Sequence, residues 1–351
     1  MRFRKRGPVL LALLLVGVPA LAGCGSGGSS RSDEIIVATH DNWAMSKKVM
    51  AEFTAKTGIT VRIATNGDAG ELTNKLVLTN GDPIADGFFG IDNTFATRAV
   101  DAGIVSPYAV PGLAPSVARF ALSGDGGSDL TPIDYGDVCV NIDDTWFAHH
   151  HLTPPATFED LAAPAYKGLT VTEGAKTSST GLAFLLATIG RFGTDGWQGY
   201  WKKLVSNGLK IEKDWSNAYE VDFTAGGGNG DRPIVVSYSS SPPFTVPKGA
   251  SRPTTSALLG TCFRQVEFAG VLKGAKNPEG MQKFIDFMSA RSFQAALPEN
   301  MYVYPVDTAV ALPPEWKRFA PIAPKPYVVT PDDITAHRDS WLASWSEITH
   351  T

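Results

Sequence analysis

The sequence predicts an α/β protein in which helices cover a mostly parallel sheet and two strands cross between two lobes. From Glu34 onward, short apolar runs of strand type alternate with segments of helical spacing, the pattern of a parallel sheet covered by helices. Two β-rich segments, 135–142 and 261–269, are flanked by turn residues and enclose a second α/β region. The 351 residues, 43% of them hydrophobic, are enough for about two domains.

The first region reads as three strands and three helices. Apolar runs at 35–38, 60–64 and 87–91 predict buried strands. Apolar residues at helical spacing predict the helices that follow them; these residues are Met45, Val49, Met50 and Phe53, then Leu72, Leu76 and Val77, then Phe95, Ala99 and Val100. Gly58 lies where the first of these helices is expected to end.

The second region and the C-terminal segment carry clearer boundaries. Residues 181–186 predict a helix and residues 234–238 a strand. Thr330 is a good N-cap, Pro331 suits the first helical position, and acidic residues follow in the first turn. This last helix is expected to continue through Trp345. The sequence shows no internal repeat.

The N-terminal segment has the pattern of a bacterial lipoprotein signal. Basic residues at 2–6 precede an apolar run at 9–18 and then Leu-Ala-Gly-Cys at 21–24. We expect residues 1–23 to be a signal peptide and Cys24 to become the lipidated N-terminus; the alternative is a core cysteine in an ordinary signal. Residues 24–33 form a Gly/Ser tether. The protein is therefore expected on the outer face of the cytoplasmic membrane.

Charge and cysteine content exclude some functions. With 35 acidic and 31 basic residues the formal net charge is -4, which gives no electrostatic footprint for nucleic acid. Removal of residues 1–23 takes away four basic and no acidic residues, so the mature charge is -8 (-4 - 4), mildly favouring a cationic ligand.

The remaining Cys139 and Cys262, one on each crossing segment, either form a disulfide or stay as buried thiols.

No motif in the chain supports catalysis, a cofactor or a metal. The run His149, His150 and His151 lacks neighbours at metal-ligand spacing and reads as an exposed loop. The glycine-rich stretch 226–230 lacks the Lys-Ser/Thr of a phosphate-binding loop. Ser178 or Ser179 with His40 as base would be the components of an envelope hydrolase, but no nucleophile motif supports this.

Aromatic and hydroxyl residues gather where loops meet predicted strand ends. In open α/β sheets ligands bind in crevices beyond the carboxyl ends of strands. Flat side chains there suit a flat or cationic ligand, through stacking and cation–π attraction. The segments are 40–43, 92–93, 177–179, 215–216, 238–241 and Tyr302.

These residues resemble the periplasmic thiamine-binding proteins, type 2 substrate-binding proteins of ATP-driven importers. The resemblance extends from about Glu34 to Ile348 and is specific only when its segments are taken together. They are 90–93, 134–136, 177–182, 215–219, 237–242, 304–306, 338–341 and 344–345.

The resemblance implies a monomer of the type 2 periplasmic-binding-protein fold that closes on thiamine and delivers it to an ABC permease. One lobe would comprise residues 34–137 and 265–351, the other 138–264. The implied ligand contacts are Asp92, Asn93, Ser178, Ser179, Trp215, Tyr238, Ser239, Ser240 and Ser241, with His40 and Tyr302 stacking. His40 and Tyr302 stand where the family usually has Tyr and Trp, and Phe244 replaces a Tyr and so lacks its hydroxyl.

Other ligands in the same fold remain alternatives. A polyamine site needs several carboxylates, of which only Asp92 is well placed by the sequence. Ferric-ion binders usually have adjacent tyrosines, whereas Tyr238 is followed by Ser239. A surface adhesion protein would lack a cleft lined by Trp215, Tyr238 and Asp92.

Overall fold

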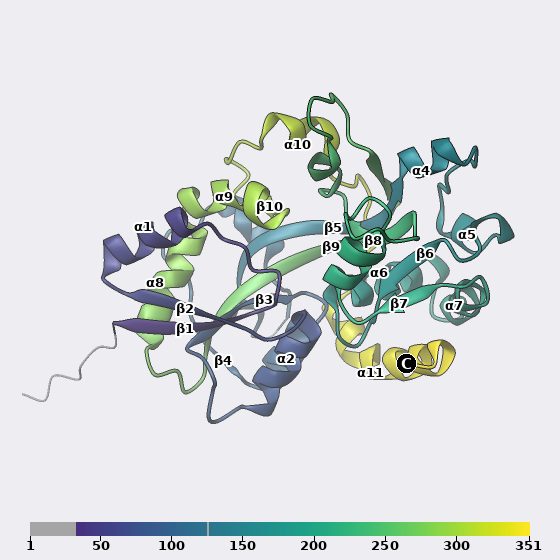
Figure 1. Ribbon diagram of the computed structural model, residues 1–351. Helices are drawn as coiled ribbons and strands as arrows, with labels where there is room; N and C mark the ends of the chain where they lie inside the picture. Colours follow the sequence, from purple (N-terminus) through teal and green to yellow (C-terminus); the bar gives the residue numbers. More distant parts are fainter. Residues whose placement is uncertain (1–32, 125) are drawn as a thin grey trace, which may run out of the picture. The chain divides into compact units, whose positions relative to one another are not determined.

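The computed structural model describes residues 33–124 and 126–351, and these form the body of the protein (Figure 1). The predicted signal peptide, Cys24 and all of the tether except Asp33 lie outside the described residues. Within the two described ranges, no helix has the length and apolar character needed to cross a membrane.

The body is organised on one ten-stranded sheet, whose main path runs in the order β2-β1-β3-β9-β5-β8-β6-β7. Two short strands lie off this path, β10 beside β5 and β4 beside β9. The strands are β1 (Glu34–Thr39), β2 (Thr60–Thr65), β3 (Gly87–Asp92), β4 (Val105–Ser106), β5 (Thr131–Asp143), β6 (Thr170–Glu173), β7 (Lys210–Glu212), β8 (Ile234–Tyr238), β9 (Thr255–Leu272) and β10 (Tyr304–Pro305).

The prediction of a mostly parallel sheet is correct at the two flanks and wrong in the centre. Strand β1 is parallel to β2 and β3, and β6 is parallel to β7 and β8. The two long central strands, β5 and β9, are antiparallel to each other, and each is antiparallel to its outer neighbour. The chain passes through the middle of the sheet out along β5 and back along β9, so no helical crossover is needed between them.

Helices cover the sheet. The α-helices are α1 (Lys47–Thr57), α2 (Ala69–Leu78), α3 (Ala96–Asp101), α4 (Asp144–His149), α5 (Phe158–Leu161), α6 (Ser179–Phe192), α7 (Trp197–Ser206), α8 (Pro278–Ser289), α9 (Arg291–Met301), α10 (Pro314–Phe319) and α11 (Pro331–Thr349). Short 3₁₀ turns occupy Pro115–Phe120, Gly127–Asp129, Pro164–Tyr166 and Pro242–Thr245, and a π-helix, η4, spans Asn217–Asp222.

Two predicted helix boundaries are confirmed. Gly58 ends α1 with a positive φ of 73°, and its N–H donates to the carbonyl of Thr54. Thr330 begins α11, because its side chain accepts a hydrogen bond from the N–H of Asp333 at 3.1 Å.

Two apolar layers hold the flanks of the sheet in place. Beside β1 and β3, the ring of Phe53 packs edge-on against Phe284 of α8, with centroids 5.1 Å apart. On the other flank α6 is buried over most of its length, and α7 packs against α11, where Trp201 meets Trp345 at 5.7 Å (Figure 1). These layers keep the loops at the strand ends in fixed positions.

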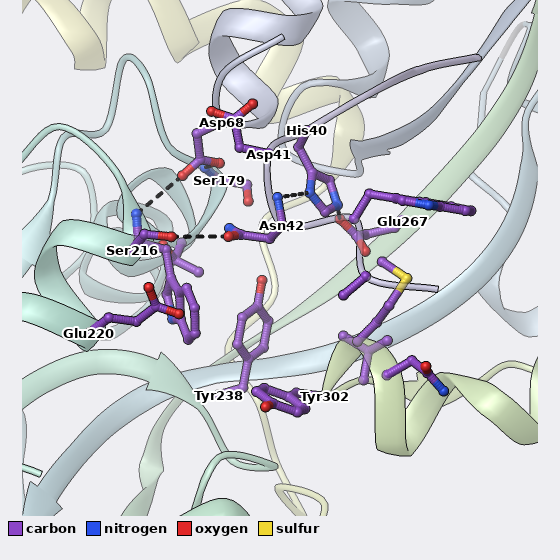
Figure 2. A pocket seen from close by; sticks show the side chains of 17 residues that line it. His40, Asp41, Asn42, Asp68, Ser179, Ser216, Glu220, Tyr238, Glu267 and Tyr302 are labelled. Carbon is purple, nitrogen blue, oxygen red and sulfur yellow. Dashed lines mark hydrogen bonds and ion pairs between the residues drawn. The ribbon is translucent and has the colours of Figure 1, made fainter. Parts of the chain in front are cut away.

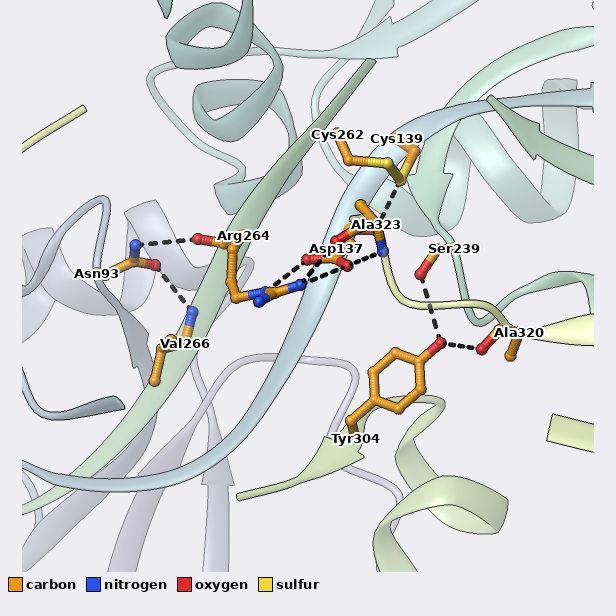
Figure 3. Close-up of polar contacts among 10 residues, drawn as sticks. All are labelled: Asn93, Asp137, Cys139, Ser239, Cys262, Arg264, Val266, Tyr304, Ala320 and Ala323. Atoms are coloured by element: carbon orange, nitrogen blue, oxygen red, sulfur yellow. Dashed lines mark hydrogen bonds and ion pairs between the residues drawn. A yellow bond between two sulfur atoms is a disulfide. The ribbon is translucent and has the colours of Figure 1, made fainter. Parts of the chain in front are cut away.

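The crossing strands are joined covalently and by an ion pair (Figure 3). Cys139 of β5 forms a disulfide with Cys262 of β9. Close by, the guanidinium of Arg264 binds both carboxylate oxygens of the buried Asp137, at 2.8 and 2.9 Å, and Asp137 also accepts from the N–H of Ala323 at 2.7 Å. The centre of the sheet is therefore a rigid platform beneath the strand ends.

Candidate functional site

A cleft of about 380 Å³ lies where strand ends and helix starts from distant parts of the chain meet (Figure 2). Its volume is in the range typical of small-molecule sites. The lining residues come from the loop after β1, the start of α2, the start of α6, the η4 turn, the end of β8, the middle of β9 and the end of α9. They are His40, Asp41, Asn42, Trp43, Ala44, Asp68, Ser179, Thr180, Trp215, Ser216, Glu220, Tyr238, Glu267, Asn300, Met301, Tyr302 and Val303.

Trp215 forms part of the aromatic lining and is held rigidly. One face of its indole stacks on the ring of Tyr219, with centroids 4.8 Å apart and planes 10° from parallel. The indole Nε1 donates to Ser237 Oγ at 3.0 Å. Because its orientation is fixed before any ligand arrives, Trp215 offers a flat surface at low entropic cost.

Tyr238 is a second fixed aromatic residue. Its hydroxyl donates to Gln265 Oε1 at 2.9 Å, and its ring passes over Gly136 of β5. A Cβ at Gly136 would lie 2.6 Å from the ring, so a glycine is required at that position. Burial and nearby carboxylates raise the pKa of Tyr238 well above its usual value, so the phenol stays neutral.

Tyr302 also lines the cleft, near Tyr238, and has a strained backbone conformation (Figure 2). It ends α9 with φ of 62°, a conformation that is uncommon for a bulky residue. Its ring packs on Phe244, with centroids 3.6 Å apart, and its carbonyl accepts from the hydroxyl of Ser240. Phe244 therefore supports Tyr302 rather than lining the cleft.

His40 and Glu267 form a buried pair in the cleft wall. His40 Nε2 lies 3.1 Å from Glu267 Oε1, while Nδ1 accepts from the N–H of Asn42. Burial alone would lower the pKa of His40, but the carboxylate of Glu267 outweighs it and raises that pKa above 6.5. The ring lies over Gly90, where a Cβ would approach it to 2.1 Å.

Asp68 lines the cleft and connects distant segments of the chain. It caps α2, and its carboxylate also accepts from the N–H groups of Ser179 and Trp215, each at 3.4 Å. Burial raises the pKa of this carboxyl, although hydrogen bonds from Ser178 and Ala69 act in the opposite direction. A single buried side chain thus contacts the start of α6 and Trp215, which lies two residues before η4.

Four carboxylates line the cleft, and three of them lie outside the segments that the sequence predicts for the site: Asp68, Glu220 and Glu267. Asp41 belongs to segment 40–43, which the sequence predicts for the site. Its Oδ1 accepts a hydrogen bond from the N–H of Gly67 at 3.0 Å. Asp92, the one carboxylate that the sequence places at the site, does not line this cleft. The sequence around an acidic residue at a helix cap or within a strand does not show whether its side chain will contact a ligand.

Five of the predicted contacts line the cleft, and six do not. His40, Ser179, Trp215, Tyr238 and Tyr302 are brought together as expected. The residues that lie elsewhere are Asp92, Asn93, Ser178, Ser239, Ser240 and Ser241.

Asp92 and Asn93 are used inside the protein. Asp92 is fully buried, where its carboxylate accepts from Thr94 and from Gln265 Nε2 at 3.0 Å. The side chain of Asn93 bridges the backbone of Arg264 and Val266 (Figure 3). Asp92 therefore lies behind the cleft, positioning the Gln265 amide that holds Tyr238.

The four serines that do not line the cleft have buried partners as well. Ser178 Oγ pairs with Thr180 Oγ1 at 2.9 Å. Ser239 lies 3.4 Å from the hydroxyl of Tyr304 (Figure 3). Ser241 pairs with Ser237 at 3.0 Å. Ser240 donates to the carbonyl of Tyr302. The hydroxyls of Ser239, Ser240 and Ser241 stabilise the loop that follows Tyr238, whereas that of Ser178 lies at the start of α6.

Hydrolytic and metal chemistry find no support in the described residues. There, the hydrogen-bond partners of Ser178 and Ser179 include no histidine. No three His, Cys, Asp or Glu side chains in that part of the chain are grouped to hold a metal. The histidine run is exposed as predicted, but His149 ends α4 and His150 stacks on Trp146, so it is a helix end rather than a loop.

Sequence comparison relates this architecture to known proteins. The model for bacterial extracellular solute-binding proteins matches residues 82–323. The thiamine-binding periplasmic protein of Escherichia coli (strain K12) is 26% identical over 319 residues, which cover 89% of this chain and 92% of that protein. Its counterpart in Brucella melitensis is 27% identical, covering 96% and 98%. The iron uptake protein A1 of Synechocystis is 25% identical, covering 85% of each chain.

Solved structures of periplasmic binding proteins share the fold of this chain. A periplasmic thiamin binding protein superposes with a TM-score of 0.78 at 25% identity, covering 92% of this chain and 98% of that one. Iron-bound HitA from Pseudomonas aeruginosa shares the fold, with a TM-score of 0.68 at 20% identity over 90% and 99% of the two chains. The fold is thus of the type 2 periplasmic-binding-protein class.

The two thiamine-binding relatives are named as periplasmic proteins, and the matching family is described as extracellular solute-binding proteins. These names support an extracytoplasmic transport role rather than an enzymatic one. The family match spans well over half of the chain and includes the central strands and most of the cleft residues. This chain belongs to the family of bacterial extracellular solute-binding proteins.

Proposed function

We propose that this protein captures thiamine outside the cytoplasm and, as a monomer, delivers it to the membrane permease of an ABC importer. One observation carries the proposal: a single cleft combines the aromatic side chains of Trp215, Tyr238 and Tyr302 with four carboxylates. The relatives that are named for thiamine binding support the same ligand.

The chemistry of thiamine matches this lining. Its aminopyrimidine is flat and carries hydrogen-bonding groups at its edge, and its thiazolium is permanently cationic. We assign stacking on the rings to Trp215 and Tyr238, and hydrogen bonding to the hydroxyl of Ser179. The buried carboxylate of Asp68, rather than Asp92, is then the acceptor for the exocyclic amine.

Closure of the cleft must supply much of the affinity. Nanomolar binding requires about -12 kcal/mol, whereas each stack or cation–π contact contributes roughly 0.5–2 kcal/mol. We propose that residues 34–137 with 265–351 form one lobe, that 138–264 form the other, and that their closure buries the ligand. The contacts of Asp68 with Ser179 and Trp215 cross this boundary and favour the closed state.

We also propose that Cys24 is lipidated and holds the protein at the outer face of the cytoplasmic membrane. The support is the sequence around Cys24 together with the Gly/Ser tether that follows it. In a bacterial host, Cys24→Ser should move the protein from the membrane fraction to the soluble fraction. Membrane retention of that variant, with no lipid on the mature N-terminus by mass spectrometry, would contradict the anchor.

A polyamine is the second candidate ligand. Four carboxylates around one cleft are what a polycationic chain requires, and this observation favours it more than the sequence did. A bound ferric ion has less support, because the described residues do not group three His, Cys, Asp or Glu side chains.

Isothermal titration calorimetry on the mature domain distinguishes the candidates. Thiamine, putrescine, spermidine and ferric citrate would be titrated separately, with intrinsic tryptophan fluorescence as a second readout from Trp215. We expect submicromolar binding of thiamine only. Binding of spermidine without binding of thiamine would replace the proposal with the second candidate.

A further inference from the structure

We propose that the cleft selects thiamine over its phosphate esters and that Glu220 is a specificity-determining residue for this choice. The inference rests on the proposed function and concerns the form of the ligand. Asp41, Asp68, Glu220 and Glu267 line the cleft, while no Lys or Arg does so in the described part of the chain. His40 is the one basic side chain in that lining, and Glu267 already faces it at 3.1 Å.

A carboxylate already takes up part of the place in this cleft that would suit a phosphate. The start of a helix such as α6 usually accepts anions, because its first N–H groups lack partners within the helix. Here the N–H of Ser179, the first residue of α6, donates to the carboxylate of Asp68. The N–H of Trp215 donates to the same carboxylate. A phosphate approaching these donors would meet Asp68 first.

Glu220 adds negative charge that the protein does not neutralise. It lies on η4, one residue after Tyr219, and it is exposed while lining the cleft (Figure 2). No ion-pair partner of Glu220 exists among the residues described. The nearby lysines form ion pairs with other residues: Lys210 pairs with Asp222 at 2.6 Å, and Lys213 pairs with Asp214 at 3.1 Å.

The charge of the ligand decides the direction of the effect. Thiamine carries one positive charge, whereas a phosphate monoester adds about -1.5 to -2 at pH 7 and makes the molecule anionic overall. Charges a few ångströms apart in a partly wet cleft change affinity by roughly threefold to tenfold per pair. Glu220 therefore favours the free cation and disfavours both the monophosphate and the diphosphate.

Glu220 is a better probe of this effect than the other carboxylates. Asp68 and Glu267 are buried and have internal partners, and Asp41 accepts from the backbone of Gly67, so changing any of them alters local structure. Glu220→Gln removes only charge. Glu347→Gln on α11 is the matched control, because Glu347 is exposed and does not line the cleft.

The experiment is calorimetry with thiamine, thiamine monophosphate and thiamine diphosphate at low and at high salt, on wild type and both variants. We expect wild type to bind thiamine at least about tenfold more tightly than the monophosphate at low salt, and the ratio to shrink as salt screens the carboxylates. Glu220→Gln should reduce the ratio by about threefold, whereas Glu347→Gln should leave it unchanged.

Two results would overturn the inference, and each is distinct from failure of the proposed function. Equal affinity of wild type for thiamine and its monophosphate would show that the cleft does not discriminate, while thiamine capture would stand. An unchanged ratio in Glu220→Gln would remove Glu220 as the determinant. If thiamine itself does not bind, the proposed function fails and this inference fails with it.

Discussion

Ser216 Oγ donates a hydrogen bond to Asn42 Oδ1 over 3.1 Å, and the two residues are 174 positions apart in the chain (Figure 2). Asn42 belongs to the loop after β1, and Ser216 immediately precedes η4. Both line the cleft, so this bond joins its two walls next to the ligand volume. A contact of this kind stabilises the closed arrangement only when both partners are present.

The first prediction tests that contact with a double-mutant cycle. Asn42→Ala and Ser216→Ala should each weaken thiamine binding by roughly threefold to tenfold, the value of one hydrogen bond of about 0.5–1.5 kcal/mol. The double variant should be no weaker than the poorer single variant, because the same bond is lost only once. Calorimetry measures all four affinities, and strictly additive losses would show that the two side chains act independently.

The second prediction concerns the stacked indole. Trp215→Ala should weaken thiamine binding by about 1–3 kcal/mol, by analogy with stacking of bases on aromatic side chains. Trp215→Phe should recover part of the loss. The matched control is Trp146→Ala, which removes an indole that stacks on His150 outside the cleft. Calorimetry on the three variants gives the comparison, and unchanged affinity in Trp215→Ala would mean that the ligand lies elsewhere.

Much of the fold could be predicted because its signals are local. The strands at 35–38, 60–64, 87–91 and 234–238 and the caps at Gly58 and Thr330 depend on neighbours in sequence, and the structure has them. The antiparallel centre depends on how β5 and β9 pair across more than a hundred residues. No apolar pattern within either segment specifies the direction of its partner.

The site was less predictable for a related reason. Trp215, Tyr238 and Tyr302 could be found because large aromatic residues at strand ends are unusual outside a core or a site. Asp68 resembles an ordinary helix cap, and only the folded chain shows that it also meets Ser179 and Trp215. Asp92 lies outside the cleft lining, and the sequence gives no sign of its contact with Gln265, which is 173 positions away.

The third prediction is a pH dependence caused by Asp92. Burial is the largest cause that raises the pKa of this carboxyl, from 3.8 to about 7, against the opposing hydrogen bonds from Thr94. The folded state therefore keeps a proton that the unfolded state releases above about pH 4. The stability linked to this proton is present below pH 4 and is lost as the pH rises toward 7, by up to about 1.4 kcal/mol per unit.

Urea unfolding of wild type and Asp92→Asn between pH 4 and 8 measures this effect. Relative to Asp92→Asn, which cannot ionise, wild type should lose free energy of unfolding as the pH rises. Asp101→Asn, an exposed carboxyl at the end of α3, controls for the loss of one charge and should keep a constant difference from wild type. A constant difference for Asp92→Asn as well would show that the buried carboxyl does not bind a proton in this range.

The last prediction concerns the bond between the crossing strands. The Cys139–Cys262 disulfide closes a loop with a sequence separation of 123, and restricting so long a loop in the unfolded chain should contribute about 2–5 kcal/mol of stability. The paired strands also meet through Asp137 and Arg264, so the native arrangement does not depend on the disulfide alone. Cys139→Ser with Cys262→Ser should therefore fold and bind thiamine with nearly unchanged affinity, yet unfold at lower urea concentration.

Treatment with a reducing agent distinguishes the effect of losing the disulfide from the effect of the two serine substitutions. Reduction should lower the unfolding midpoint of wild type toward that of the double serine variant and should leave the variant itself unchanged. Neither cysteine lines the cleft, and both are buried with Ala323, so a loss of stability need not alter the ligand site. If the double variant keeps wild-type stability, the disulfide adds nothing to the folded state; if it loses thiamine binding while remaining folded, the central strands transmit strain to the cleft.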